Sequence, residues 1–266
     1  MSPYSDISVE ALASGAQLIR LNRPEVRNAL RTSMLGEIAA ALEAAEQDES
    51  LRCVLLTGNE QAFAAGADVR EMAELDAVGL FKDQRPEHWR RIRRFHKPLI
   101  AAVNGYCLGG GFELALHADI IVAGDNARFG QPEINLGIIP GAGGTQRLVR
   151  CAGKALAMKM VLSGETITAR EALAAGIVAE VTQPETALER SMELAQVIAG
   201  KPPLALRLAK ECVLQAFEAP LEQGLELERR AFLFLAATED RREGIEAFLA
   251  KRPPRFEGAS VSQRRY

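Results

Sequence analysis

The chain has 266 residues, a formal net charge of −3, and 48% hydrophobic and 25% charged residues. This length is enough for one large domain, or for a core with a helical extension. The near-neutral charge argues against general nucleic-acid binding. No segment offers the roughly 18 uninterrupted apolar residues that a membrane span needs, and the first residues lack the pattern of a secretory signal. We therefore expect a cytoplasmic protein that binds neither nucleic acid nor a membrane.

The cysteines are scattered singly along the sequence, without the paired spacing of a zinc site or the density of a disulfide scaffold. They are Cys53, Cys107, Cys151 and Cys212. We expect them to be buried, reduced thiols. His88, His96 and His117 show no metal-ligand spacing, so we predict no metal site and no catalytic histidine.

Hydrophobic patterning in the first part of the chain predicts a hairpin, a helix and a buried strand. Residues 7–13 and 17–21 are predicted strands around a Ser14-Gly15 turn. Apolar residues recur at helical spacing over residues 32–46. Residues 53–57 form a continuous apolar run, which is typical of a strand buried on both faces.

A glycine-rich stretch in the middle of the chain is the first candidate for a site. A short apolar strand and a turn precede Gly109, Gly110 and Gly111, and the helical pattern that follows contains Glu113. Glycines leave the N–H groups at a helix start open to a ligand oxygen. Taken alone, however, this pattern more often means tight strand-to-helix packing, with the glutamate complementing the helix dipole.

Residues 75–95 are more polar and are broken by Arg85-Pro86, so we expect a surface excursion or lid before the central strand. A second buried strand is predicted at residues 120–123, followed by a loop rich in glycine and proline up to residue 145. Apolar strands separated by helices indicate mainly parallel pairing.

The last part of the chain changes from a mixed pattern to helices alone near residue 200. The expected helices are residues 144–150, 154–162, 169–175, 185–199, 205–216, 220–237 and 239–250, with a strand at 178–181. The three final helices are amphipathic, and their apolar residues need a cover, either the chain's own core or a subunit interface. We expect the tail, residues 253–266, to be poorly ordered.

Three motifs in register resemble the enoyl-CoA hydratase/isomerase (crotonase) superfamily. They are residues 63–68 (FAAGAD), residues 101–115 and residues 129–145. The similarity runs from about Val9 to Phe256. It implies an α/β crotonase-type superhelix of repeated β-β-α units over residues 1–195. A C-terminal helical trimerisation region, residues 196–266, would then build a homotrimer or homohexamer.

The resemblance implies reversible syn addition of water to a trans-2-enoyl-CoA, with an acyl-CoA thioester as substrate and no metal or redox cofactor. Within the superfamily the chain most resembles hydratases of phenylacetate catabolism, which act on 2,3-dehydroadipyl-CoA. A Δ3,Δ2-enoyl-CoA isomerase and an acyl-CoA hydrolase are alternatives of the same fold. A non-catalytic RNA-binding relative is an alternative of another class, but the predicted helix at residues 32–46 is acidic rather than lysine-rich.

The resemblance also assigns roles to four residues. The N–H groups of Ala67 and Gly110 match the donors that stabilise the negative charge on the thioester oxygen. Glu113 and Glu133 match the two glutamates that hold the reacting water. We assign water activation mainly to Glu113 and proton delivery to the α-carbon mainly to Glu133. Without this pairing, Glu133 would more simply be a loop carboxylate that caps a backbone turn.

Recognition of the CoA moiety is implied by resemblance for a short segment and one distant lysine. These residues are Ala65, Asp68, Val69, Arg70 and Lys251, with Arg70 near a phosphate. A lone basic residue is as readily explained as a solvated side chain. Arg85 or Arg90 is the candidate partner of a distal carboxylate, because both lie in a basic segment beside Trp89.

Phe112 departs from the family pattern, in which a small residue commonly precedes the catalytic glutamate. Its ring would either tighten the packing behind the helix or reshape the acyl pocket.

Overall fold

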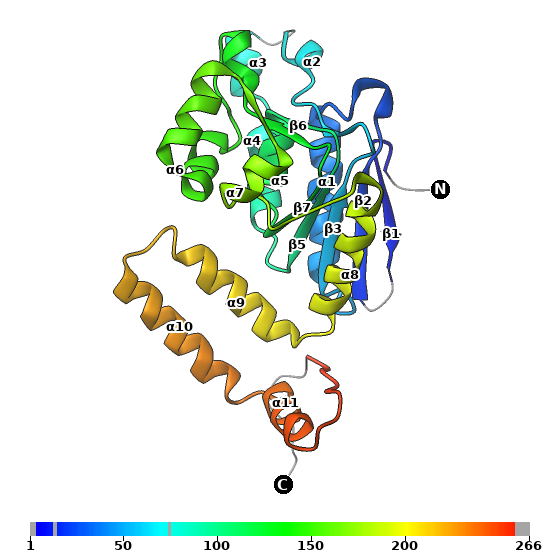
Figure 1. Cartoon of the computed structure of the whole chain (residues 1–266), viewed down its shortest axis with the longest axis vertical. Coiled ribbons are helices and arrows are strands. Elements are labelled where there is room, and N and C mark those ends of the chain that lie inside the picture. Colours follow the sequence, from blue (N-terminus) through cyan, green and yellow to red (C-terminus); the bar gives the residue numbers. More distant parts are fainter. Residues whose placement is uncertain (1–3, 13–14, 74–75, 259–266) are drawn as a thin grey trace.

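The computed structural model describes residues 4–12, 15–73 and 76–258. Within them the core is a succession of β-β-α units, which confirms the expected architecture (Figure 1). The units are β1 (Ile7–Ala11), β2 (Ala16–Leu21) and α1 (Thr32–Gln47); β3 (Cys53–Thr57), β4 (Ala62–Ala64) and α2 (Val69–Ala73); β5 (Leu99–Val103), β6 (Tyr106–Leu108) and α5 (Gly110–Ala115); and β7 (Ile120–Gly124), β8 (Arg128–Gly130) and α6 (Gly144–Ser163).

The larger sheet has six described strands in the order β1-β2-β3-β5-β7-β10, with β10 at Glu180–Thr182. The β1–β2 pair is antiparallel and the others are parallel. Val54 and Leu56 of β3 pack into the cluster that contains α1, whereas Cys53 and Leu55 pack with α8 (Ala187–Ala199) on the opposite face. Helices therefore cover both faces, which explains the continuous apolar runs of β3 and β5.

The smaller sheet has four described strands in the order β4-β6-β8-β9, with β9 at Thr166–Thr168. Each strand has three residues, which is too short to show a period of two in the sequence, so the patterning did not reveal this sheet. Gly105, with φ +60°, lets the chain turn from β5 into β6, and an added Cβ there would lie 1.9 Å from Gln61 O. The chain after β4 and β6 enters the loops that carry the candidate site.

Helices α3 (Ala77–Phe81) and α4 (Arg85–Arg93) form the predicted excursion between α2 and β5. In α6 the backbone breaks at Gly153, with φ 74° and ψ 168°, so the two predicted helices form one kinked element. The predicted loop between β7 and α6 contains β8 and the 3-10 helix η3 (Pro132–Leu136). Helix α7 (Ala169–Ala174) begins with a capping box at Thr168.

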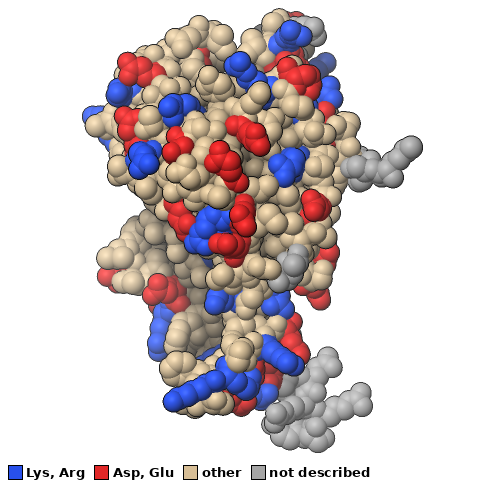
Figure 2. Space-filling model, turned by 45° about the vertical axis from the view of Figure 1, so that its right-hand side comes forward, with Lys and Arg blue, Asp and Glu red and all other residues tan. Residues whose placement is uncertain are grey.

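Three helices extend away from the sheets at the C-terminal end of the chain (Figure 1). They are α9 (Pro203–Gln215), α10 (Leu221–Leu235) and α11 (Glu239–Leu249), each within two residues of the predicted bounds. The expected division at residue 195 stays a prediction, and that residue lies inside α8, which ends at Ala199. Figure 2 shows acidic and basic side chains interspersed over the main body on the face that it presents.

Two smaller expectations need correction. All four cysteines are free, but Cys151 is exposed and Cys212 is only partly buried, so the prediction of buried thiols holds for Cys53 and Cys107 alone. The described part of the tail is bound to the body, because Phe256 O accepts a hydrogen bond from Arg52. Ser14, Leu75 and residues 259–266, on which other expectations fall, lie outside the described residues. None of the described helices is long and apolar enough to span a membrane.

Candidate active site

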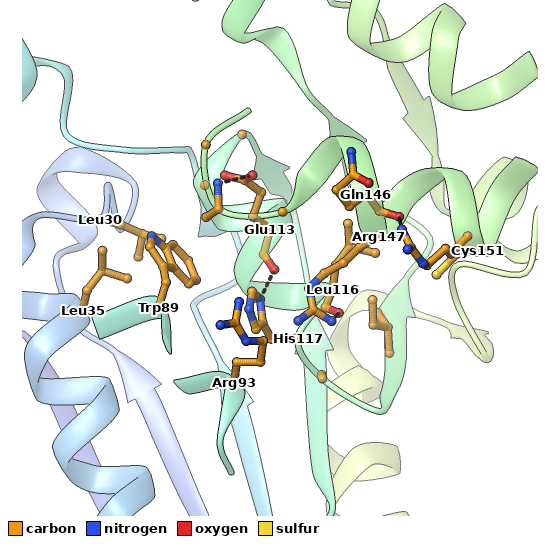
Figure 3. A pocket seen from close by; sticks show the side chains of 18 of the residues that line it. Leu30, Leu35, Trp89, Arg93, Glu113, Leu116, His117, Gln146, Arg147 and Cys151 are labelled. Atoms are coloured by element: carbon orange, nitrogen blue, oxygen red, sulfur yellow. Dashed lines mark hydrogen bonds between the residues drawn. The ribbon is translucent and has the colours of Figure 1, made fainter. Parts of the chain in front are cut away.

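A cavity of about 1420 Å³ lies where the loops after β4 and β6 meet the N-terminal part of α6 (Figure 3). Its wall brings together all three motifs that the sequence analysis found at separate places in the chain. The first motif contributes Ala65, Gly66 and Ala67, the second contributes Gly109, Gly110 and Glu113, and the third contributes Glu133 in η3. Arg85 and Trp89 of α4 line the same cavity.

Two backbone N–H groups meet at the start of α5. A Cβ built on Gly110 would lie 3.5 Å from Ala67 N, which places the two peptide groups next to each other. Gly110 is in the first turn of the helix, where N–H groups have no partner within the helix. The loop of Ala67 is fixed through Leu30, whose N–H donates to Gly66 O (N···O 2.8 Å) and whose carbonyl accepts from Asp68 N (2.9 Å). Both donors are therefore held by rigid backbone.

Glu113 is almost fully buried, with 3% of its surface exposed. Its Oε1 accepts hydrogen bonds from Ala142 N and Gly144 N, each at 2.7 Å. Burial raises the pKa of this carboxyl, and the backbone N–H groups oppose that rise. The backbone N–H of Gly141 adds to this opposing effect, so the loop of residues 141–144 holds the carboxyl group in the cavity wall.

Glu133 lies over the turn that precedes α5. A Cβ on Gly109 would lie 3.0 Å from Glu133 Oε1, so the glycine, which also has φ +50°, lets the carboxyl group approach the turn closely. Burial raises the pKa of Glu133 to about 7, and the charge of Glu113 adds to the rise. The buried side-chain amide of Gln131 lies 3.0 and 3.1 Å from the two carboxyl oxygens of Glu133.

This arrangement gives two carboxyl groups different tasks around one space. One is fixed by backbone N–H groups, and the other has a pKa near neutrality, so at neutral pH the pair can both accept and donate a proton. Two further N–H groups at Ala67 and Gly110 can stabilise negative charge on an oxygen placed between them. The chemistry that suits this geometry is proton transfer next to a carbonyl whose oxygen gains charge.

Sequence reasoning missed the residues that hold the two glutamates. Ala142 and Gly144 belong to a run that was interpreted only as a breaker-rich loop, yet their N–H groups fix Glu113. The buried amide of Gln131 was not singled out either. A backbone N–H donor cannot be recognised from the residue type. The amide of Gln131, a polar residue between Gly130 and Pro132, was the one weak indication in the sequence.

The histidines do not contribute a catalytic group to this geometry. The ring of His117 stacks on Trp89 with centroids 5.3 Å apart, and its Nδ1 lies 2.8 Å from Glu113 O. Burial, with a smaller effect from Arg147, lowers the pKa of His117 to about 3, so the ring stays neutral in the cavity wall. His88 and His96 are absent from this wall.

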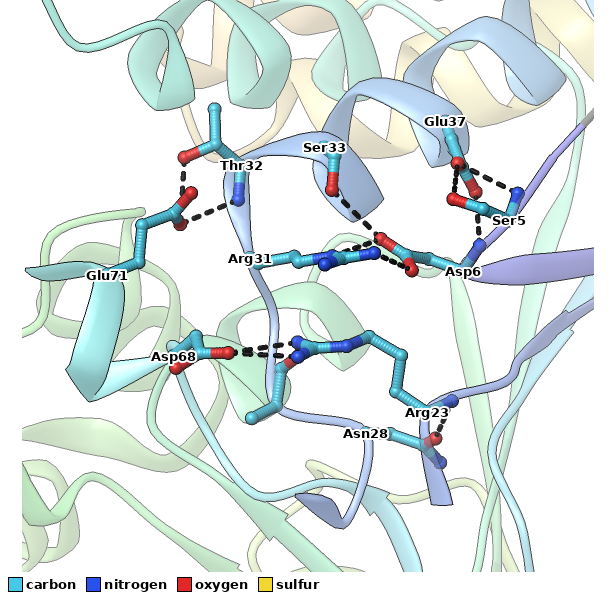
Figure 4. Close-up of polar contacts among 11 residues, drawn as sticks. Ser5, Asp6, Arg23, Asn28, Arg31, Thr32, Ser33, Glu37, Asp68 and Glu71 are labelled. Atoms are coloured by element: carbon cyan, nitrogen blue, oxygen red, sulfur yellow. Dashed lines mark hydrogen bonds and ion pairs between the residues drawn. The ribbon is translucent and has the colours of Figure 1, made fainter. Parts of the chain in front are cut away.

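The residues predicted to bind the CoA moiety are only partly brought together. Ala65 and Val69 line the cavity. Asp68 instead forms an ion pair with Arg23 at 3.1 Å, within a polar cluster that anchors the loop (Figure 4). Arg70 is exposed and does not line the cavity, and Lys251 follows α11, at the opposite end of the molecule from α2 (Figure 1). The structure therefore does not bring Lys251 to this chain's own cavity.

A family profile described as Enoyl-CoA hydratase/isomerase matches residues 12–259. The chain belongs to this family. Its match runs from β2 through the C-terminal helices, so it covers all three motifs of the site rather than one of them.

Individual family members are similar over almost the whole chain. The 2,3-dehydroadipyl-CoA hydratase of Escherichia coli K12 is 56% identical over 241 residues, which cover 91% of this chain and 94% of that protein. The mitochondrial enoyl-CoA hydratase of Pongo abelii is 46% identical, covering 90% of this chain and 82% of that protein. A crystal structure of enoyl-CoA hydratase subunit I from Geobacillus kaustophilus superposes with a TM-score of 0.93 at 47% identity, covering 97% and 100% of the two chains.

The departure at Phe112 does not reach the cavity of this family member. The ring is fully buried and packs against Phe129, with centroids 5.3 Å apart and planes tilted by 52°. Phe112 does not line the cavity. Of the two alternatives for Phe112, the structure supports tighter packing behind α5.

Proposed function

We propose that this protein is an enoyl-CoA hydratase that adds water reversibly, in the syn sense, to a trans-2-enoyl-CoA. The observation that supports this best is the convergence of Glu113 and Glu133 on one cavity beside the adjacent peptide groups of Ala67 and Gly110. Hydration of an unsaturated thioester needs both a base and an acid, and it places negative charge on the thioester oxygen.

The proposed mechanism uses each group in one role. The N–H groups of Ala67 and Gly110 bind the thioester oxygen and stabilise its charge in the enolate-like transition state. Glu113, as a carboxylate held at Oε1, accepts the proton of the water that attacks C3. Glu133, which keeps its proton up to about neutral pH, delivers a proton to C2. In the reverse reaction the two roles exchange.

The alternatives lose support from particular observations. An isomerase moves one proton between two carbons and needs one carboxyl group, whereas here two carboxyl groups line the cavity. An RNA-binding role would favour a basic helix face, but α1 carries Glu37, Glu43 and Glu46. A hydrolase would direct water at the thioester carbon, so release of free thiol distinguishes it from a hydratase.

The test is a direct assay of the purified chain. Loss of the enoyl absorbance of crotonyl-CoA measures hydration, a thiol reagent measures hydrolysis, and a 3-enoyl-CoA substrate measures isomerisation. We expect the first reaction to dominate by orders of magnitude. Dominant thiol release or 3-enoyl turnover would replace the proposal with the corresponding alternative.

The pH dependence of hydration follows from the two carboxyl groups. Glu133 must be protonated to donate, so kcat/KM is expected to fall as the pH rises through its pKa of about 7. Glu113 must be ionised to accept a proton, so activity also falls at acid pH. Because burial raises the pKa of Glu113, this fall begins at a higher pH than for an ordinary glutamate. A bell-shaped profile of crotonyl-CoA hydration measures both limbs. A rate that is flat from pH 6 to 9 would contradict the assignment of Glu133.

We also propose 2,3-dehydroadipyl-CoA as a substrate, supported by the 56% identity to the Escherichia coli enzyme of that name. Ala65 and Val69 would line the path of the CoA moiety, and Arg70 would meet a phosphate from its exposed position. The expected independence from any cofactor and the cytoplasmic location stay predictions.

We further propose that the C-terminal helices assemble this chain into a homotrimer or a homohexamer. Phe232 of α10 and Phe248 of α11 are 63% and 82% exposed in the single chain, and so large an apolar surface calls for a partner. Phe248→Ser is expected to shift the particle toward monomers, measured as molar mass by light scattering. A wild-type chain that runs as a monomer at micromolar concentration would contradict the proposal.

A further inference from the structure

The side chains of Asp83 and Arg85 form an ion pair in the cavity wall, at the start of α4. Arg85 Nε donates to Asp83 Oδ2 at 2.6 Å, and Arg85 N donates to Asp83 Oδ1 at 2.9 Å. Both side chains are only 12% exposed. One carboxylate therefore holds both the backbone and the guanidinium of Arg85, which fixes the direction of the side chain.

The ion pair uses only the Nε edge of the guanidinium. Neither terminal nitrogen of Arg85 has a hydrogen-bond partner among the described residues, and neither is fully enclosed by protein. Arg85 lines the cavity, and its terminal nitrogens are the part of the guanidinium that the protein leaves without a partner among the described residues. Two parallel N–H donors in a fixed plane match the two oxygens of a carboxylate.

The other arginines of α4 do not combine these properties. Arg90 pairs with Glu87, and both side chains are about half exposed. Arg91 is bound to Glu43 through Nε and one terminal nitrogen. Arg93 is exposed and lies beside His117 (Figure 3). Arg85 is thus the arginine of this helix that is mostly covered by protein while its terminal nitrogens have no partner among the described residues.

Arg85 is connected to Glu113 through the part of the cavity wall that Trp89 and His117 form. It lies one helical turn before Trp89, so the two side chains share a face of α4. Trp89 stacks on His117, which follows α5 and lies four residues after Glu113. The indole therefore separates Arg85 from Arg93, and each arginine stands at one end of the wall that Trp89 forms beside Glu113.

We propose that Arg85 binds the carboxylate at the far end of a dicarboxylyl-CoA chain, and that Asp83 positions its guanidinium. This inference rests on the proposed hydratase function, because it names the group at the end of that substrate. The substrate carboxylate accepts hydrogen bonds from both terminal nitrogens, while Asp83 continues to accept the hydrogen bond from Nε. Because the ion pair fixes the guanidinium before binding, little side-chain freedom is lost when the substrate enters.

The test compares chains that are equal in length and differ only in the distal carboxylate. For the wild-type protein and Arg85→Met, kcat/KM is measured with 2,3-dehydroadipyl-CoA and with trans-2-hexenoyl-CoA. The ratio of the two values is expected to fall by at least about tenfold in Arg85→Met, as for the loss of a charge-assisted hydrogen-bond pair. Arg91→Met, as the matched control on the same helix, is expected to keep the wild-type ratio, because Arg91 is bound to Glu43 and does not line the cavity.

Binding of the saturated chains separates this inference from the proposed function. Calorimetric titration with adipyl-CoA and hexanoyl-CoA reports the carboxylate contact even in a chain that hydrates nothing, whereas crotonyl-CoA turnover by the wild-type protein tests hydration alone. The preference for adipyl-CoA is expected to fall by at least about tenfold in Arg85→Met.

Three outcomes would overturn the assignment of Arg85. Equal losses with both chains would mean that the guanidinium binds a CoA phosphate or supports the fold. If Arg93→Met rather than Arg85→Met lost the preference for the chain with the distal carboxylate, that carboxylate would bind at Arg93, at the other end of the Trp89 wall. A wild-type protein without preference for adipyl-CoA would show that no carboxylate site exists. Asp83→Asn should weaken the preference without abolishing it, since the amide oxygen can still accept from Nε.

Discussion

Glu113→Gln and Glu133→Gln are each expected to lower the turnover of crotonyl-CoA by about 10²- to 10⁴-fold, the range of general acid-base catalysis. Glutamine keeps the shape of the side chain but cannot exchange a proton. In Glu113→Gln the amide oxygen can still accept from Ala142 N and Gly144 N, so the loop should stay in place while the base is lost. The measurement is kcat from the decay of enoyl absorbance.

Substrate binding is the control for both variants. The thioester is bound by backbone groups at Ala67 and Gly110, so the dissociation constant of a saturated acyl-CoA should change little. Glu87→Gln removes a half-exposed carboxylate that pairs with Arg90 and should leave turnover unchanged. Near-normal turnover in Glu113→Gln or Glu133→Gln would remove that residue from the mechanism.

The two variants should also differ in their pH profiles. Glu133→Gln removes the group whose pKa is about 7, so the residual activity should lose its decline on the alkaline side. Glu113→Gln should lose the acid limb instead. This contrast tests which glutamate acts as the acid. In the sequence analysis, that assignment rested on the family resemblance alone.

Long elements could be predicted from the sequence because their patterning is strong. The run of β3 is apolar because α1 and α8 cover its two faces, and the helical spacing over residues 32–46 reflects the single buried face of α1. The predicted gap between the helices at residues 144–150 and 154–162 contains Gly153, where the backbone has a positive φ that glycine adopts freely.

The parts that the sequence could not show are those made by short segments and backbone atoms. The smaller sheet consists of three-residue strands whose pairing is set by the β-β-α repeat. The partner of Glu113 is a pair of peptide N–H groups, which any residue except proline provides. Even Arg85, named from a basic segment, became distinct from Arg90 only through burial and the ion pair with Asp83.

The two adjacent glycines at the start of α5 should respond differently to an added methyl group. A Cβ on Gly111 would lie 2.2 Å from Ala64 O and 2.7 Å from Ala64 Cβ, so α5 and β4 must move apart. We expect Gly111→Ala to destabilise the fold by about 3 kcal/mol or more, as for an overpacked core with rigid neighbours. Thermal unfolding measures this loss.

Gly110→Ala should keep the fold and lose the chemistry. Its added Cβ would meet Ala67 N at 3.5 Å and Leu30 Cδ1 at 3.7 Å, which are ordinary contacts, so the melting temperature should stay near that of the wild type. The methyl group would nevertheless stand beside the Ala67 N–H, where the thioester oxygen must bind. Blocking that donor should lower kcat by about 10²- to 10³-fold. Normal turnover in Gly110→Ala would mean that the thioester oxygen binds elsewhere, because a methyl group and that oxygen cannot share the space between the two N–H groups.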